Sequence, residues 1–247
     1  MKTAIIGGSG LEKLDIFEIL EECSVSNAFG TPSTPLITGR IKGHEVVFLS
    51  RHGFGHTTPP SQVNNRANIM ALKEAGCERI IATTACGSLR EEIGRGHLVI
   101  PDQFIDFTRH RAVTFHEHFD EGKIMHTPMA DPFDQSLRLK IIEAARDLPV
   151  IIHQKGTVIT IEGPRFSTRA ESHMFRAWGA DVINMSTAPE VILANEAGIP
   201  YAAIAMSTDY DCWKSGEEAV SWEAVLEVFS QNVHNVTDLL LRFFDRN

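Results

Sequence analysis

The sequence has no long apolar run and no pattern of a secretory signal. No stretch approaches the roughly 18 to 20 apolar residues that cross a bilayer, and the mean hydropathy is -0.08. The start, MKTAIIGGSG, places one Lys and a very short apolar stretch before a glycine cluster, unlike a signal peptide. We therefore expect neither export nor a membrane association, and we predict a cytoplasmic location.

Positive charge and paired cysteines are also scarce. Lys and Arg number 23 against 32 Asp and Glu, which gives a formal charge of -9 at pH 7. This balance is opposite to the basic footprint of nucleic-acid-binding proteins, so no nucleic-acid partner is expected and any bound phosphate must be held by local donors. The four cysteines form no CxxC pair, which favours reduced thiols; they are Cys23, Cys77, Cys86 and Cys212.

What the chain does contain is the composition of an ordinary globular protein. Its 247 residues are 43% hydrophobic and 22% charged, with 18 Gly and 11 Pro, which excludes disordered, collagen-like and coiled-coil classes. No repeat, low-complexity segment or linker divides the sequence. We therefore predict a single domain over residues 1–247.

Short β-rich runs alternate with helical patterns along nearly the whole chain, which predicts an α/β fold with a central mixed β-sheet flanked by helices. Segment Thr108–Met129 has four histidines and few periodic apolar residues, so we expect a long loop there. The expected strands are Thr3–Ile6, Glu45–Ser50, Arg79–Thr84, Leu98–Phe104, Gly156–Glu162, Asp181–Met185 and Tyr201–Ser207. The expected helices are Ser61–Ala75, Gln135–Leu148, Thr168–Trp178, Pro189–Ala197 and Glu217–Phe244, with Gly76, Gly179 and Gly198 at C-terminal stops.

The first glycine turn does not match a dinucleotide site. Gly8 and Gly10 are followed by Lys13 where the fingerprint requires a third Gly or Ala, which argues against a nicotinamide-dependent dehydrogenase. The turn keeps free backbone amides and the Ser9 hydroxyl, which suit an anion. An ordinary tight turn is an equally good interpretation of these residues alone.

Small polar and basic residues follow other expected strands, where ligands bind in open α/β sheets. Arg is well shaped to hold phosphate, although an isolated Arg-His pair is more often a solvated strand end. Taken together, these junctions predict a pocket of little net charge for phosphate or a similar oxyanion. The residues concerned are Arg51, His52, Thr84, Ala85, Gly87, Ser186 and Thr187.

Asp209 and Asp211 stand two residues apart at the end of an expected strand, where such side chains face the same way. Like charge and partial burial raise a carboxyl pKa, so one of the two is expected to hold a proton near neutrality and to act as a general acid. A solvated acidic turn is the competing interpretation. The apolar strand before the pair and Trp213 after it argue against full exposure.

Other chemical motifs are weaker. His116, Glu117 and His118 match no metal-ligand spacing, so we assign no metal. Cys86 has no partner His in the sequence and no GxSxG elbow is present, so covalent acyl chemistry is unsupported.

Long segments nevertheless resemble a known family. IIGGSGL, SRHGFGH, the stretch from NNRANIM to VIPDQFID, and TIEGPRFSTRAESHMFRAWGADVINMSTAPEVILANEAGIPYAAIAMSTDYDCW are similar to the 5'-methylthioadenosine phosphorylases, within the trimeric class of purine nucleoside phosphorylases. The resemblance covers most of the chain. It implies an α/β phosphorylase fold, a homotrimer, and phosphorolysis of a purine N-glycosidic bond. It also implies inorganic phosphate as co-substrate and no metal or organic cofactor.

The resemblance also implies roles for individual residues. Asp209 and Asp211 would contact N7 and the 6-amino group of the base, Phe166 would pack on the purine, and Ser167 would bear on substrate choice. Asn184 and Met185 would line the ribose and base. The phosphate ligands would be Ser9, Arg51, His52, Thr84, Ala85 and Ser186.

The region around the 5' substituent follows the family pattern less closely. Trp222 stands where eukaryotic relatives have a small aliphatic residue, and Val225 and Leu226 are expected to supply an apolar wall. His56 and His126 are expected to approach the sugar. Preference for a methylthio group over a hydroxyl at 5' is therefore less directly supported than preference for adenine.

The leading hypothesis is release of adenine and 5-methylthioribose 1-phosphate from 5'-methylthioadenosine, in purine and methionine salvage. The alternative enzyme is a purine nucleoside phosphorylase of broader or 6-oxopurine specificity, acting on inosine, guanosine or 5'-methylthioinosine. The Asp pair argues against it, because a 6-oxo group would meet an ionised carboxylate lone pair to lone pair. A nucleoside hydrolase and a noncatalytic purine or phosphate sensor also stay open.

Overall fold

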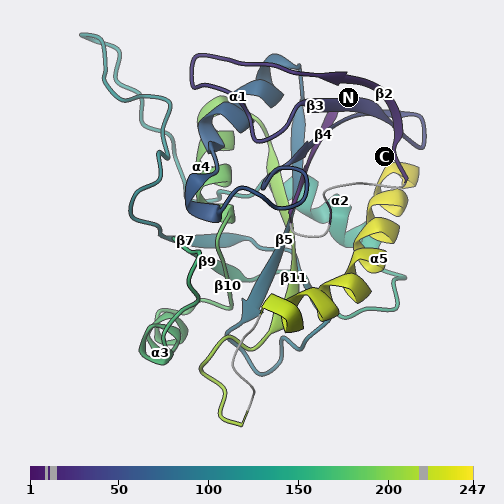
Figure 1. Ribbon diagram of the computed structural model, residues 1–247, viewed down its shortest axis with the longest axis vertical. Coiled ribbons are helices and arrows are strands. Elements are labelled where there is room, and N and C mark those ends of the chain that lie inside the picture. Colours follow the sequence, from purple (N-terminus) through teal and green to yellow (C-terminus); the bar gives the residue numbers. More distant parts are fainter. Residues whose placement is uncertain (9–10, 12–15, 217–221, 247) are drawn as a thin grey trace.

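A mixed β-sheet forms the centre of the computed structural model, which describes residues 1–8, 11, 16–216 and 222–246. Helices cover both faces of this sheet (Figure 1), which confirms the predicted α/β class. The eleven strands within these residues are β1 Thr3–Gly7, β2 Glu18–Cys23, β3 Leu36–Ile41, β4 His44–Ser50, β5 Arg79–Ser88, β6 Leu98–Val99, β7 Gln103–Phe107, β8 Ile152–His153, β9 Thr157–Ile161, β10 Val182–Asn184 and β11 Tyr201–Asp209. The α-helices are α1 Asn65–Glu74, α2 Gln135–Ala145, α3 Arg169–Ala177, α4 Thr187–Ala197 and α5 Trp222–Arg246, and a 3-10 turn spans Pro60–Gln62.

Strand β5 is the hub of the sheet. It runs parallel to β1 over its first four residues and to β11 over most of its length, and its last two residues pair antiparallel with β10. Strand β1 also pairs parallel with β4. The carboxyl ends of β4, β5 and β11 therefore lie at the same edge of the sheet. The chain that leaves β10 passes this edge.

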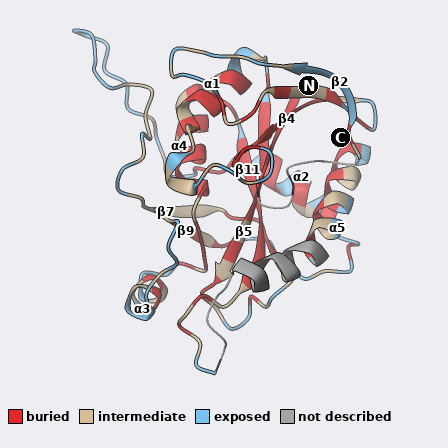
Figure 2. Ribbon diagram, in the orientation of Figure 1, coloured by how far each residue is buried: buried red, intermediate tan, exposed pale blue. Residues whose placement is uncertain are grey.

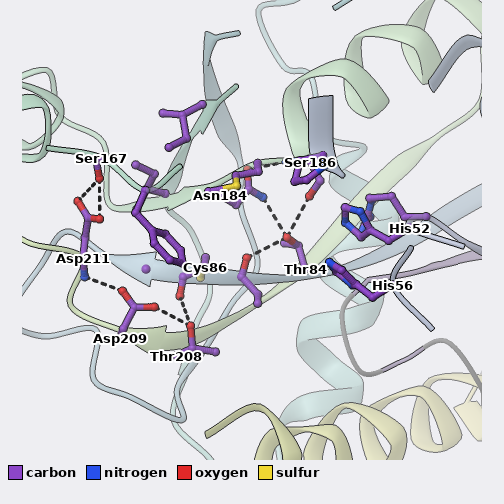
Figure 3. Close-up of a pocket in the computed structure, with 18 residues that line it drawn as sticks. His52, His56, Thr84, Cys86, Ser167, Asn184, Ser186, Thr208, Asp209 and Asp211 are labelled. Atoms are coloured by element: carbon purple, nitrogen blue, oxygen red, sulfur yellow. Dashed lines mark hydrogen bonds between the residues drawn. The ribbon is translucent and has the colours of Figure 1, made fainter. Parts of the chain in front are cut away.

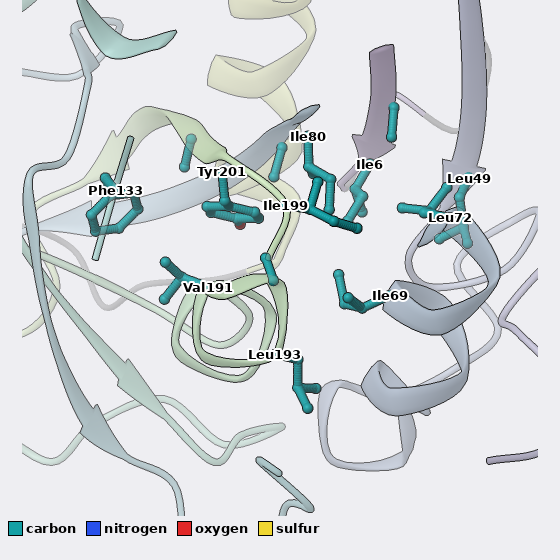
Figure 4. Packing of buried hydrophobic residues seen from close by; sticks show 14 of the residues in the cluster. Ile6, Leu49, Ile69, Leu72, Ile80, Phe133, Val191, Leu193, Ile199 and Tyr201 are labelled. Carbon is teal, nitrogen blue, oxygen red and sulfur yellow. The ribbon is translucent and has the colours of Figure 1, made fainter. Parts of the chain in front are cut away.

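Alternate residues of the central strands fill two separate cores. Ile80 and Ala82 of β5 pack on one side with residues of α1 and α4, whereas Ile81 packs on the other side with residues of α2 and α5. This division follows from the two-residue period of a strand. Figure 2 shows the buried central strands between the helices, and Figure 4 shows Ile69, Leu72, Val191 and Leu193 closing one face over the sheet.

Several predicted elements are confirmed with adjusted ends. The helix expected from Ser61 begins at Asn65, because Pro59 and Pro60 start a 3-10 turn that precedes it. The side chain of Asn64 then caps α1 by accepting from the N–H of Ala67 at 3.1 Å. Helix α4 begins at Thr187 rather than Pro189, since Pro fits the first helical turn where no N–H partner is needed. The predicted stop glycines have positive φ, at 75° for Gly76, 90° for Gly179 and 71° for Gly198.

Three predictions of strands were wrong or incomplete. The single strand expected over Leu98–Phe104 is two strands, β6 and β7, and Pro101, which has no N–H for a ladder, lies between them. The strand expected to end at Thr84 continues to Ser88. Strands β2, β3 and β8 were not predicted; β2, with the sequence EILEEC, is exposed at the sheet edge and has no apolar run to reveal it.

The segment predicted as a long loop, Thr108–Met129, contains no helix or strand, as expected. It follows β7 and extends away from the body of the molecule as the long teal loop in Figure 1. No helix among the described residues is long and apolar enough to span a membrane.

Candidate active site

One pocket gathers side chains from segments that are far apart in the sequence (Figure 3). They come from the turn after β4, the second half of β5, the loop after β9, the end of β10 and the end of β11. The lining residues are Arg51, His52, His56, Pro60, Thr84, Ala85, Cys86, Gly87, Ile161, Phe166, Ser167, Ile183, Asn184, Met185, Ser186, Thr208, Asp209 and Asp211.

The extension of β5 explains how two of these segments meet. Because β10 pairs antiparallel with Gly87 and Ser88, the chain that leaves β10 passes alongside Thr84. The hydroxyl oxygens of Thr84 and Ser186 lie 3.0 Å apart, and Nδ2 of Asn184 donates to Oγ1 of Thr84 at 3.2 Å. Thr84 is thus part of a strand rather than of a turn after it, and three polar side chains form one continuous group.

Asn184 is held from both sides. Its Oδ1 accepts from the Thr160 hydroxyl at 2.8 Å, and its Nδ2 also donates to Oγ1 of Thr187 at 2.6 Å. Helix α4 begins with the hydroxyl of Ser186 directed to Thr84, and Ser186 makes no side-chain cap bond to the helix. The first N–H groups of the helix are bonded by other side chains instead: that of Thr187 donates to Oδ1 of Asn184 at 3.4 Å, and that of Ala188 donates to Oγ1 of Thr160 at 3.0 Å.

Arg51 lines the same pocket as Thr84 and Ser186, and three of its five N–H groups already have hydrogen-bond partners within the protein. Nε and Nη2 donate to the two carboxylate oxygens of Glu190, the latter at 2.9 Å, and Nη1 donates to the carbonyl of Thr83 at 2.9 Å. The guanidinium has five N–H bonds, so among the described residues one on Nη1 and one on Nη2 remain for a ligand. The guanidinium lies so close to Gly8 that this position must be glycine, because a Cβ there would lie 2.8 Å from Nη1 of Arg51.

His52 lies beside Arg51 with a defined ring orientation. Its Nδ1 lies 3.0 Å from the carbonyl of Thr58, and because a carbonyl only accepts, Nδ1 carries the proton. The ring stacks on His56, with centroids 4.3 Å apart. The predicted anion residues Arg51, His52, Thr84, Ala85 and Ser186 are therefore brought together, whereas Ser9 lies outside the described residues.

The two aspartates lie at the other end of the pocket, but not as the predicted pair of strand side chains. Asp209 ends β11, whereas Asp211 stands in the following turn with φ 47°, a conformation that Asp tolerates. The backbone N–H of Asp211 donates to Oδ1 of Asp209 at 2.7 Å. The turn therefore replaces carboxyl-to-carboxyl contact with a hydrogen bond.

Each aspartate has a hydroxyl partner. Thr208 Oγ1 lies 2.8 Å from Oδ2 of Asp209 and 3.2 Å from the carbonyl of Cys86, and Ser167 Oγ lies 2.6 and 2.7 Å from the oxygens of Asp211. Burial raises the pKa of Asp209 above its usual range, against the hydrogen bonds from Thr208 and from the Asp211 N–H that lower it, and the Asp211 charge adds to the rise. Trp213, expected not to be exposed, is buried and donates to the carbonyl of Ser88 at 2.8 Å.

Apolar groups separate the two polar ends. Ile161, Ile183 and Met185 line the pocket, and the ring of Phe166 is 41% exposed at its margin. The carbonyl of Met185 accepts from Nη1 of Arg111 at 2.6 Å, and Arg111 also donates to Glu162. A flat apolar ligand with polar edges fits between such walls.

One predicted residue, His126, lies away from this pocket, and the side chains of three others are outside the described part of the chain. His126 is exposed on the long loop and packs edge-on against Phe119, with centroids 5.8 Å apart, because the loop extends away from the body of its own chain. Trp222, Val225 and Leu226 belong to α5, but their side chains lie outside what the structure describes. Glu117 of the His-Glu-His motif pairs with Arg66 at 2.8 Å, and no cluster of metal-ligating side chains is found among the described residues.

Sequence reasoning missed several residues that shape the site. Pro60, Ile161 and Ile183 line the pocket and were not singled out as site residues. Glu190 and Arg111 are buried charged residues that contact pocket residues. The stretch TAPEVILANEA contains two acids, and Glu190 directly precedes its apolar run VILA, which is the one signal that could have marked it.

Comparisons with known proteins agree with this geometry. The model of the family described as the phosphorylase superfamily matches residues 2–245. The chain is 56% identical to S-methyl-5'-thioadenosine phosphorylase of Xenopus tropicalis over 247 residues, covering 98% of this chain and 87% of that protein. It is 53% identical to the protein of the same name from Danio rerio, again covering 98% of this chain and 87% of that protein.

Solved structures show the same similarity. Methylthioadenosine phosphorylase from Schistosoma mansoni in complex with adenine superposes with a TM-score of 0.93 at 43% identity, covering 98% of this chain and 90% of that chain. A mutant of the adenosine/methylthioadenosine phosphorylase of that organism, in complex with methylthioadenosine, superposes with a TM-score of 0.92 at 41% identity, with the same coverage.

Proposed function

The chain belongs to the phosphorylase superfamily and, within it, to the S-methyl-5'-thioadenosine phosphorylases, and we propose on this premise that it cleaves S-methyl-5'-thioadenosine with inorganic phosphate. The enzyme is a pentosyltransferase, and its products are adenine and 5-methylthioribose 1-phosphate. The observation that carries this function is a single pocket with anion donors at one end and, at the other, Asp209, whose pKa is raised.

The phosphate half of the reaction is assigned to Arg51, His52, Thr84, Ala85 and Ser186, with Ser9 as a further ligand. Their hydroxyl, imidazole and guanidinium groups hold the phosphate so that one oxygen attacks C1' on the face opposite N9. The C1'–O bond forms as the C1'–N9 bond breaks with oxocarbenium character. Placing both reactants in one pocket supplies the orientation that such a displacement needs.

The purine half is assigned to the two aspartates. The electron pair of the broken bond moves into the purine, and Asp209 delivers its proton to N7 as general acid. Asp211, held by Ser167, accepts a hydrogen bond from the 6-amino group, while Phe166 packs on the ring. No relative reported above is named for a 6-oxopurine substrate, so the alternative specificity receives no support.

The sugar lies between these ends. Asn184 and Met185 line the ribose in this proposal, and His56 lies beside His52 at the phosphate end. Trp222, Val225 and Leu226 remain proposed residues of the 5' pocket, and His126 remains a proposed sugar contact.

The proposal extends to assembly and location. We take residues 1–247 as one domain that acts as a cytoplasmic homotrimer in purine and methionine salvage, with phosphate as co-substrate and no other cofactor. Exposed apolar side chains on the long loop support association, because Phe119, Ile124 and Met125 are 43%, 67% and 52% exposed. Light scattering tests the trimer, and a monomer at working concentration would refute it.

The decisive experiment measures adenine release from 5'-methylthioadenosine with and without phosphate. Phosphate-dependent release, with formation of the sugar 1-phosphate, is the expected result. Release without phosphate would identify a hydrolase. No release, combined with turnover of inosine or methylthioinosine, would restore the 6-oxopurine alternative.

A further inference from the structure

Glu190 is a buried carboxylate directly behind the pocket. It lies in the first turn of α4 and is 1% exposed, and it does not line the pocket itself. Its two oxygens accept from Nε and Nη2 of Arg51, whose side chain is 2% exposed. A carboxylate so far from water is retained only where it has partners of this kind.

Tyr201 completes the group from the first residue of β11. Its hydroxyl donates to Oε2 of Glu190 at 2.8 Å, and its side chain is 1% exposed. Burial, followed by the Glu190 charge, raises the pKa of Tyr201 well above its usual range, so the hydroxyl keeps its proton and remains a donor. Oε2 of Glu190 therefore accepts from both Arg51 and Tyr201.

This arrangement fixes the plane of the guanidinium. A bidentate Arg–carboxylate contact permits one orientation, whereas a single hydrogen bond permits rotation about it. A third hydrogen bond, from Nη1 to the Thr83 carbonyl, further fixes the position of the guanidinium. As a result, the two remaining N–H bonds, one on Nη1 and one on Nη2, have fixed directions.

We propose that Glu190, itself held by Tyr201, is the positioning residue for Arg51 and aims the two remaining guanidinium N–H bonds at the attacking phosphate. The inference rests on the proposed role of Arg51 as a phosphate ligand. Neither Glu190 nor Tyr201 touches substrate, and both act through Arg51. Their contribution is therefore specific to the phosphate half of the reaction.

The variant Glu190→Gln removes the charge and one acceptor together, and the direction of the change in KM for phosphate shows which of the two matters. The glutamine has nearly the same shape but only one acceptor oxygen, and its NH₂ would face either Nε or Nη2 of Arg51, donor against donor. Arg51 then keeps one bond where it had two. We expect the KM for phosphate to rise tenfold or more, while the KM for the nucleoside stays within twofold.

The variant Tyr201→Phe is the milder test, because it removes only the hydroxyl. We expect the KM for phosphate to rise about threefold. Since Tyr201 acts through Glu190, the double variant should resemble Glu190→Gln alone instead of showing the product of the two effects. If Glu190→Gln yields no folded protein, Tyr201→Phe carries the test by itself.

A matched control is available outside the pocket. Asp181 accepts from Nε of Arg90 at 2.9 Å and from the N–H of Thr157, so Asp181→Asn makes the same chemical change at another arginine. This control should leave the KM for phosphate unchanged. An equal rise in both variants would mean that the effect is a general loss of structure and would overturn the inference.

Two further outcomes would contradict the proposal. A lower KM for phosphate in Glu190→Gln would show that Glu190 merely offsets the charge of Arg51, and an unchanged KM with a lowered melting temperature would show a purely structural role. Failure of the proposed function looks different. In that case the wild-type protein would show no phosphate-dependent turnover, or Arg51→Lys would leave the KM for phosphate unchanged.

Discussion

The backbone N–H of Asp211 donates to Oδ1 of Asp209 across 2.7 Å, so the turn that follows β11 is tied to the carboxyl that ends it. The link places two carboxylates at one end of the pocket without direct contact between them. It also gives the two residues separate environments. Asp209 is bonded by Thr208 and a backbone amide, whereas Asp211 is bonded by Ser167.

Replacing Asp209 by Asn should slow adenine release from 5'-methylthioadenosine by about 10²- to 10⁴-fold, the range of a general acid. The asparagine keeps the shape of the carboxyl but has no acidic proton for N7. Steady-state kcat is the measurement, and Asp120→Asn on the exposed loop is the control. Full activity of Asp209→Asn would refute the general-acid role.

The pH dependence should follow the proton on Asp209. Its pKa is raised and the protonated form is the active one, so kcat/KM should fall as the pH rises through that pKa. Thr208→Val removes a hydrogen bond that favours the ionised carboxylate, so the alkaline limb should move to higher pH. Thr208→Ser keeps the hydroxyl and should keep the wild-type profile; a shift toward lower pH in Thr208→Val would contradict the assignment.

Ser167→Ala should weaken nucleoside binding and leave phosphate binding alone. The hydroxyl holds the Asp211 carboxylate, and a hydrogen bond to a charged group contributes about 1.5 to 3 kcal/mol. We expect the KM for 5'-methylthioadenosine to rise by about tenfold or more. Ser136→Ala, at an exposed position on α2, is the control, and an equal rise in the KM for phosphate would argue against this role.

Arg111→Ala should destabilise the protein. The side chain is 3% exposed and bonds to Glu162 and to the carbonyl of Met185, so its loss removes this donor from the Met185 carbonyl and leaves Glu162, within the described part of the chain, with only backbone N–H partners, at a cost of about 2 to 3 kcal/mol. Thermal unfolding should show a melting temperature lower by roughly 5 to 10 °C. Arg146→Ala, at an ion pair whose arginine is 69% exposed, should change little; equal losses would show that burial of Arg111 is unimportant.

The sequence predicted best where a local pattern decides the structure. Continuous apolar runs identified β1, β4 and β11, and glycine stops marked helix ends. Strand β2 was missed because its exposed acidic sequence lacks that pattern. The end of β5 was misplaced because its last residues pair antiparallel with β10, a long-range partner that no local signal records.

The same distinction applies to the site. Arg51, Thr84, Ser186 and Asp209 stand next to strand ends or within strands and carry recognisable chemistry, so the sequence singled them out. Glu190 did not stand out because its partner Arg51 is 139 residues away. Its role is visible only once α4 is packed against the sheet.

The long separations between partners in the pocket also bear on folding. Thr84 and Ser186 are 102 residues apart, so no short fragment of the chain holds both, and each contact closes a large loop whose entropy cost must first be met. Phosphate and purine thus have no binding site on an unfolded or half-formed chain. Both ligands will bind only the native state, and each will raise the melting temperature in proportion to the logarithm of its concentration above its dissociation constant.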